Sequence, residues 1–141
     1  MSGNRGLRAL AVFAVVFGVV TVISGGRTLL DPRVRAAAEP VVPFVLHFNT
    51  IAGFGYVAAG LGFWRERRWS ALLAIGLAGS TLLVFAAFGV HVTLGGTFAE
   101  RTLFAMLFRS VAWCALAFVS SRKLGVGRPL AANPQSRASR P

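Results

Sequence analysis

Four apolar runs, each long enough to cross a bilayer as a helix, occupy most of this 141-residue chain. They cover residues 7–24, 41–64, 69–94 and 102–121. A helix needs about 20 mostly apolar residues to span the hydrocarbon of a bilayer, and each run reaches or approaches that length. The sequence therefore predicts an all-α integral membrane protein, with a bundle of four transmembrane helices over residues 1–123.

Composition supports lipid as the solvent of these runs. Hydrophobic residues make up 55% of the chain and charged residues only 13%, whereas soluble proteins are about one quarter charged. A soluble protein of this size could not bury so much apolar surface in one core. The single cysteine, Cys114, excludes an intrachain disulfide and any CxxC redox or metal motif.

The net charge of +11 does not indicate nucleic-acid binding, because the basic residues cluster at the ends of the apolar runs. Ten of the 15 basic residues fall on one side of the membrane when the N-terminus is inside, four fall on the other, and Arg109 lies within a run. The positive-inside rule therefore predicts that both termini are cytoplasmic in a multi-pass protein of the inner (plasma) membrane. The ten are Arg5, Arg8, Arg65, Arg67, Arg68, Arg122, Lys123, Arg128, Arg137 and Arg140.

The segments between the runs also have readable signals. A short basic turn joins the second and third runs, which predicts an antiparallel hairpin. Asp31 followed by Pro32 is typical of a helix N-cap and first turn, so we expect a short interfacial helix over residues 32–39. We expect Gly25 and Gly26 to close the first helix. The basic segment 124–141, which contains Gly and Pro, predicts a disordered cytoplasmic tail that lies on anionic lipid.

Small residues four apart predict how the helices pack. Ala14 and Gly18 form such a pair in the first run, and further pairs follow in the second and third, at Gly55 and Ala59 and at Gly76 and Ser80. In lipid, close contact across small residues holds helices together. These pairs fit contacts within one chain or between chains, so a homo-oligomer or a larger membrane complex stays open.

The two histidines of the chain fall near the outer ends of the hairpin helices. His47 lies near the start of the second run and His91 near the end of the third, so topology gives them similar depth. Two such imidazoles could ligate a haem or take part in proton transfer. The structural alternative is that each ring caps backbone groups or contacts headgroups. We expect no metal site, because no Cys, Asp or Glu supplies an obvious third ligand.

Two polar residues of the second run are candidates for burial. Asn49 shares a helix face with Gly53, Tyr56 and Gly60, and an amide there could join two helices or contact a ligand. Tyr56 is the only tyrosine and lies in mid-helix. It could donate to Asn49 or to a bound ligand, or simply fill space.

Arg109 is the strongest candidate for a functional residue. It follows Arg101 by eight residues, which places it about 12 Å deeper along the helix, close to the middle of a bilayer. No Asp or Glu lies within any of the four runs, so its partner must be a polar group, water or an anionic ligand. Snorkelling to the surface is the structural alternative. Arg101, Ala105 and Arg109 share one face, which predicts a polar stripe leading inward.

The segment between the third and fourth runs completes the outer side. Thr97 and Glu100 match the S/T-x-x-E capping box of a helix start. Arg27 closes the first run on the same side. Arg27, Glu100 and Arg101 could therefore ring an outer vestibule together with the two histidines.

In length, four-span layout and motifs the chain resembles small bacterial membrane proteins of the broad DoxX-like type. The motifs are residues 48–53 with Tyr56, then His91, the Gly95 and Gly96 pair, and Arg109. The resemblance covers most of residues 7–121 and implies a four-span fold but no activity. The chain lacks the Thr-Phe-Ser-Thr-Phe-Ser stretch of fluoride channels and the intramembrane glutamate of small multidrug exporters.

Three classes of function remain. The first is a ligand-binding accessory subunit that holds a lipid, quinone or haem with His47, Asn49, Tyr56, His91 and Arg109. The second is a small oligomeric channel or transporter in which Arg109 meets a permeating anion. The third, a membrane enzyme, is disfavoured because the runs contain neither paired carboxylates nor a nucleophile–base–acid set. The sequence favours the first class.

Overall fold

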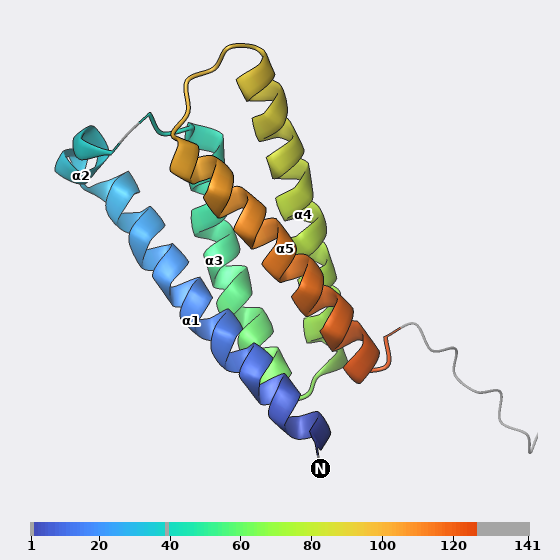
Figure 1. The fold of residues 1–141 in the computed structure, drawn as a ribbon. Coiled ribbons are helices and arrows are strands. Elements are labelled where there is room, and N and C mark those ends of the chain that lie inside the picture. The colour runs from blue at the N-terminus through green and yellow to red at the C-terminus, as the bar shows by residue number, and fades with distance from the viewer. Residues whose placement is uncertain (1, 39, 127–141) are drawn as a thin grey trace, which may run out of the picture.

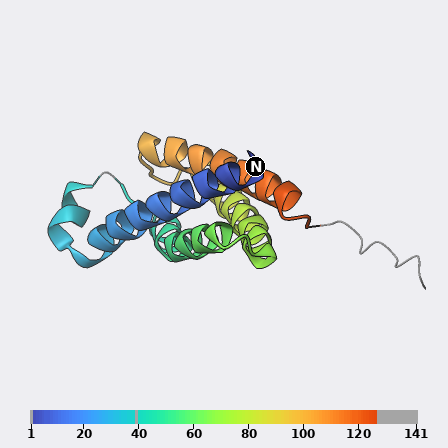
Figure 2. The same cartoon turned by 90° about the horizontal axis from the view of Figure 1, so that it is seen from below.

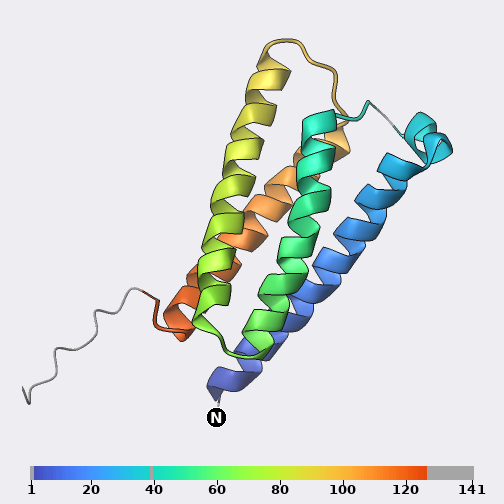
Figure 3. The same cartoon turned by 180° about the vertical axis from the view of Figure 1, so that it is seen from behind.

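Four long helices run alternately up and down, and a short fifth helix lies beside the end of the first (Figures 1 and 3). The computed structural model describes residues 2–38 and 40–126. The helices are α1 (Ser2–Leu30), α2 (Pro32–Ala37), α3 (Pro43–Trp64), α4 (Arg68–Thr93) and α5 (Glu100–Lys123). The four long ones are long and apolar enough to cross a membrane. The predicted all-helical architecture with four helices of membrane-spanning length is confirmed over the described residues, while most of the predicted tail, residues 127–141, lies outside them.

The two ends of the bundle differ in charge and in structure. One end holds the start of α1, the α3–α4 turn and the end of α5 (Figure 1). Because Arg5, Arg8, Arg68 and Lys123 lie there, we call it the basic end. The other end holds α2 and the α4–α5 connection, and α2 projects to the side of α1 there (Figure 2). We call it the α2 end.

Helices α1 and α3 form one closely packed pair, and α4 and α5 form another, with α3 and α4 joining the two. The α1–α3 contact depends on glycines. A Cβ at Gly18 would lie 2.8 Å from the Gly53 carbonyl oxygen and 2.8 Å from the Val57 backbone nitrogen. A Cβ at Gly60 would lie 2.9 Å from the Ala11 carbonyl oxygen. The predicted close packing across small residues is therefore found within the chain, at α1 against α3.

Two predicted helix signals are wrong. Helix α1 continues through Gly25 and Gly26 to Leu30 instead of closing there. A glycine inside a helix costs about 1 kcal/mol relative to alanine, but a Cβ at Gly25 would run into the Thr50 side chain, so the glycine lets α3 approach. Thr97 and Glu100 form no capping box, because α5 begins at Glu100 with Ala99 as its N-cap and without a side-chain cap hydrogen bond.

The predicted start of the short helix is confirmed. Asp31 is the N-cap of α2, its carboxylate accepts a hydrogen bond from the Arg33 backbone N–H at 2.9 Å, and Pro32 is the first helical residue. The helix ends at Ala37, two residues earlier than expected. Pro43 begins α3, as its fixed φ predicts. This connection forms the roof of the α2 end.

Among the described residues the core consists of two apolar clusters. The larger lies toward the basic end and contains Tyr56, Phe63 and Trp113 among small alanines. The smaller lies toward the α2 end and contains Val42, Val45, Phe88 and Met106. Between them along the helices is a layer of polar side chains, which we call the polar layer. It consists of Thr21 of α1, Asn49 of α3, Thr81 of α4 and Arg109 of α5.

Candidate functional site

Arg109 lies at the centre of the polar layer and faces the bundle, with 8% of its surface exposed. Its Cζ atom is 5.5 Å from the ring centroid of Phe17 on α1 and 6.0 Å from that of Tyr56 on α3. Tyr56 in turn stacks on Trp113, one helical turn beyond Arg109 on α5, with the ring centroids 4.3 Å apart. The guanidinium therefore sits over aromatic faces, which attract a cation but accept no conventional hydrogen bond.

The polar atoms around Arg109 are largely without hydrogen-bond partners. Nε and Nη1 of Arg109 are buried and unpartnered, as are Oδ1 of Asn49 and Nε1 of Trp113. The hydroxyls of Tyr56 and Thr81 are close enough to interact electrostatically, yet no hydrogen bond of good geometry joins them. Buried polar groups in proteins nearly always have a partner. This cluster of unpartnered donors and acceptors is the arrangement expected of a site that receives a ligand or ordered water.

Asn49 links the helix pairs as the sequence suggested. Its Nδ2 donates to the Met106 Sδ on α5 at 3.7 Å, a weak bond, and its Oδ1 is left unpartnered. Thr50 and Ser110 point hydroxyls back to their own helices, at the carbonyls of Leu46 and Met106. Asn49 Oδ1 can therefore accept a further hydrogen bond, while the hydroxyls of Thr50 and Ser110 already have partners.

A cavity of about 700 Å³ connects the polar layer to the α2 end. Helices α1, α3 and α5 form its walls, and α2 together with the α2–α3 connection forms its roof. Its volume lies within the range of small-molecule sites, about 300–1,000 Å³. The polar wall residues are Thr21, Ser24, Thr28, Asn49, Arg101, Thr102 and Arg109. The roof is apolar and includes Val34, Ala37, Ala38, Val41 and Val42.

The predicted polar stripe of α5 is confirmed as one wall of this cavity. Arg101, Ala105 and Arg109 all line it. Arg109 lies nine residues into α5, about 14 Å from its start, so the stripe leads from the helix end to its interior. A ligand entering at the α2 end meets an arginine at both ends of this wall.

The histidines lie at the α2 end but do not line the cavity. His47 is exposed, and its Nδ1 donates to the Pro43 carbonyl oxygen at 2.7 Å. The His91 ring packs on Gly96, its Nε2 is 3.4 Å from the Thr97 carbonyl oxygen, and Phe44 meets it edge-on at 6.2 Å. Each ring thus has a backbone partner of its own. Within the described residues no group of three or more metal-ligating side chains occurs.

The outer vestibule is only partly assembled. Arg101 lines the cavity, but Arg27 and Glu100 are exposed and do not. Tyr56 is fully buried below the cavity and contacts Arg109 through its ring. Of the predicted site residues, the structure therefore brings Asn49, Tyr56, Arg101 and Arg109 together.

Several site residues were missed from the sequence. Thr21, Ser24 and Thr28 form a polar stripe at i, i+3 and i+7 on α1, a period that could have been noticed. Trp113 follows Arg109 by four residues and so shares its face. Phe17 has no such signal, because its role depends on α1 packing beside α3.

Comparison with protein-family models, curated proteins and solved structures finds no match to this chain. The resemblance to DoxX-like proteins therefore stays a prediction from the residues, and the function must be argued from the site.

Proposed function

We propose that this protein is an integral membrane protein that binds a hydrophobic ligand with an acidic group in the cavity at the α2 end, with Arg109 as its anchor. The observation that carries the proposal is the buried, unpartnered pair of donors on Arg109, Nε and Nη1. A charged side chain inside a membrane-embedded bundle is costly, so its presence indicates a functional role. A carboxylate or phosphate beside the guanidinium would accept charge-assisted hydrogen bonds from donors that have no partner within the chain.

The rest of the cavity suits such a ligand. Asn49 and the hydroxyls of Thr21 and Ser24 supply further polar contacts beside Arg109, and Arg101 adds a second positive charge toward the opening. The roof supplies apolar contact for the remainder of the molecule. Over the described residues the lining contains no carboxylate, imidazole or thiol. This favours a ligand-binding accessory subunit over an enzyme, since no nucleophile–base pair is at hand.

The proposed orientation follows the charge of the two ends. If the protein lies in the inner (plasma) membrane with its basic end on the cytoplasmic side, the positive-inside rule is satisfied. The cavity then opens toward the outer leaflet. Ligands would then reach Arg109 from the outer side of the membrane or from its outer leaflet.

The test uses two probes that differ only in charge, a fluorescent polyene fatty acid and its methyl ester, at alkaline pH. They are titrated into protein in nanodiscs of zwitterionic lipid. Because a hydrogen bond to a charged group contributes about 1.5–3 kcal/mol, we expect the acid to bind at least about tenfold more tightly than the ester. Arg109→Met should lose most of this preference, with only the smaller effect of Arg101 left, and Arg68→Met, with the same charge change at the basic end, should keep it in full. Equal binding of both probes by the unmodified protein, or a preference of unchanged size in Arg109→Met, would refute the proposal.

One observation favours a second candidate, an anion channel or transporter. Unpartnered polar atoms continue past Arg109 toward the basic end, at Tyr56 and Trp113. Hydrogen-bond donors along such a path could pass a small anion. Proteoliposomes loaded with chloride or fluoride test this directly: flux that Arg109→Met abolishes supports a channel, and absence of flux leaves ligand binding as the function.

A further inference from the structure

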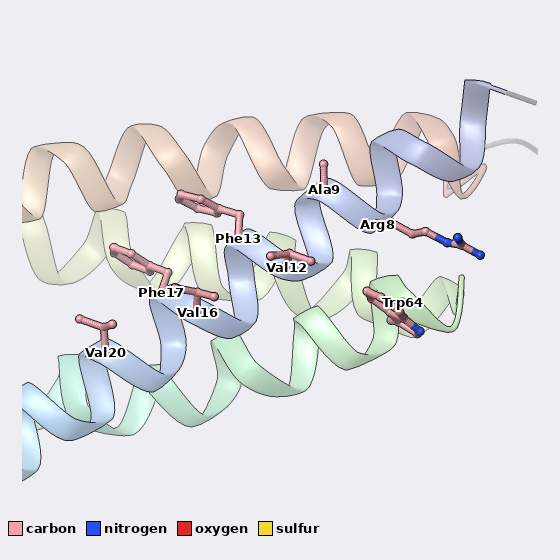
Figure 4. A pocket seen from close by; sticks show the side chains of 8 residues that line it. All are labelled: Arg8, Ala9, Val12, Phe13, Val16, Phe17, Val20 and Trp64. Atoms are coloured by element: carbon pink, nitrogen blue, oxygen red, sulfur yellow. The ribbon is translucent and has the colours of Figure 1, made fainter.

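We infer that a groove on α1 at the basic end binds one phospholipid with an anionic headgroup, seated on Arg8 and Trp64. The inference needs the membrane insertion of the proposed function but not its anion site at Arg109. The groove has a volume of about 690 Å³, begins at the basic end, and shares no lining residue with the Arg109 cavity. Figure 4 shows Arg8 and Trp64 side by side at its end, with the apolar side chains of α1 following inward.

The length of the groove matches one leaflet. Its lining runs along α1 from Arg8 to Val20, which is about 18 Å at 1.5 Å per residue. One leaflet of hydrocarbon is about 15 Å thick. An acyl chain that starts at the depth of Arg8 would therefore be covered along its length by Val12, Phe13 and Val16. These side chains are exposed in the folded chain and need an apolar neighbour.

Charge at the end of the groove selects the headgroup. The Arg8 guanidinium lies 6.0 Å from the Trp64 ring, which fixes it beside the groove while its donors stay exposed. Arg5 is one turn away, and the Lys123 ammonium packs against Gly6. No acidic residue lines the groove or lies in the first turn of α1. Three cations at this end, with Glu66 of the α3–α4 turn as a carboxylate outside the groove lining, favour a phosphate that carries net negative charge.

A second copy of the chain fits this face less well. Helices pack closely in lipid through small residues, and the small residues of α1, Ala14 and Gly18, are already used against α3. The groove face presents branched and aromatic side chains instead. A two-fold copy seated on it would also bring the positive charges of two Arg8 side chains toward each other. A flexible acyl chain fills a shallow groove of this shape without either cost.

The experiment measures quenching of Trp64 by brominated lipids. In a Trp69→Phe background the remaining tryptophans are Trp64, 57% exposed at the groove, and Trp113, which is fully buried. The full-length protein is placed in phosphatidylcholine bilayers that contain a minor fraction of either brominated phosphatidylglycerol or brominated phosphatidylcholine. One basic residue near the surface contributes about 1 kcal/mol to anionic lipid binding. We therefore expect phosphatidylglycerol to be enriched about fivefold over phosphatidylcholine at Trp64.

Arg8→Gln should abolish the excess quenching by phosphatidylglycerol, and the matched variant Arg68→Gln should retain it, because Arg68 lies at the same end on α4. Equal quenching by both lipids in the parent protein would overturn the inference, since the groove would then hold bulk lipid. An equal loss of the excess quenching in Arg8→Gln and Arg68→Gln would also overturn the inference, because it would show that the basic end attracts anionic lipid diffusely and not at one site. Quenching by neither lipid would mean that another protein surface covers the groove. None of these readouts depends on Arg109, so the failure of this site and of the Arg109 site are distinguishable.

Discussion

Replacing Arg109 with methionine should make the ligand-free bundle more stable, not less. A structural arginine would be bonded to carbonyls or carboxylates, and its removal would cost stability. Here Nε and Nη1 are buried without partners. The chain therefore holds an uncompensated charge, and methionine keeps the length and flexibility of the stem while removing it.

The size of the effect can be worked from the surroundings of the guanidinium. An arginine at the centre of a membrane helix costs about 2.5–3.5 kcal/mol on insertion scales. The aromatic faces of Phe17 and Tyr56 offset part of this cost. At 5.5 and 6.0 Å they lie near the outer limit of about 6 Å for cation–π attraction, so we take their combined contribution as about 1–2 kcal/mol, below the value for close desolvated pairs. We expect Arg109→Met to gain about 1–2 kcal/mol in free energy of unfolding.

The assay is reversible unfolding of delipidated protein in mixed micelles, followed by the circular dichroism of the helices. Arg68→Met serves as the control, because Arg68 is exposed and surface substitutions usually stay within about 0.5 kcal/mol. Adding the fatty-acid probe at about 100 times its dissociation constant should stabilise the unmodified protein by about 2.7 kcal/mol and Arg109→Met much less, which reverses the order of the two. A loss of 1 kcal/mol or more in ligand-free Arg109→Met would show that Arg109 is structural and would refute the reasoning.

Three further substitutions, the first with a matched control, test other parts of the structure. Gly18→Ala should lower the free energy of unfolding by about 1–2 kcal/mol, because its Cβ would contact the α3 backbone; Gly79→Ala, which meets nothing within 4 Å, should be neutral or stabilising by up to about 1 kcal/mol in the same unfolding assay. Asp31→Ala removes the side-chain cap of α2 and should cost about 1 kcal/mol locally, seen as faster amide exchange over residues 32–37 with the long helices unchanged. Glu66→Gly should raise the thermal midpoint, because Glu66 has φ 53° in the α3–α4 turn, where a side chain costs about 1 kcal/mol; an unchanged or lower midpoint would show that this backbone is not strained.

The sequence predicts features that depend on one helix at a time. The four long apolar helices follow from apolar length, the N-cap at Asp31 from local chemistry, and the stripe from Arg101 to Arg109 from the period of α5. The two wrong predictions of helix ends also come from local sequence patterns, which do not include contacts between helices. At Gly25 a tertiary contact with Thr50 overrides the tendency of glycine to end a helix.

Features that depend on which helices are neighbours could not be predicted. Phe17 contacts Arg109 only because α1 packs against α3 and crosses beside α5, and no pattern within residues 7–24 indicates that. The orientation of the histidine rings could not be predicted either, for the same reason. Topology gives His47 and His91 the same end of the bundle, but the rotation of α3 and α4 decides where the rings point, and each meets a carbonyl outside the cavity.

The close α1–α3 pair explains why the cavity lies where it does. Glycines allow α1 to pack closely against α3, while α4 packs mainly against α5. Helices α1 and α5 therefore make few contacts across the bundle. The cavity occupies this seam, with Thr21 and Asn49 supplied by one pair and Arg101 and Arg109 by the other. A ligand that bonds Asn49 and Arg109 together would therefore tie the two pairs to each other. It should slow amide exchange in all four long helices at once, whereas a ligand held by one pair alone would protect only that pair.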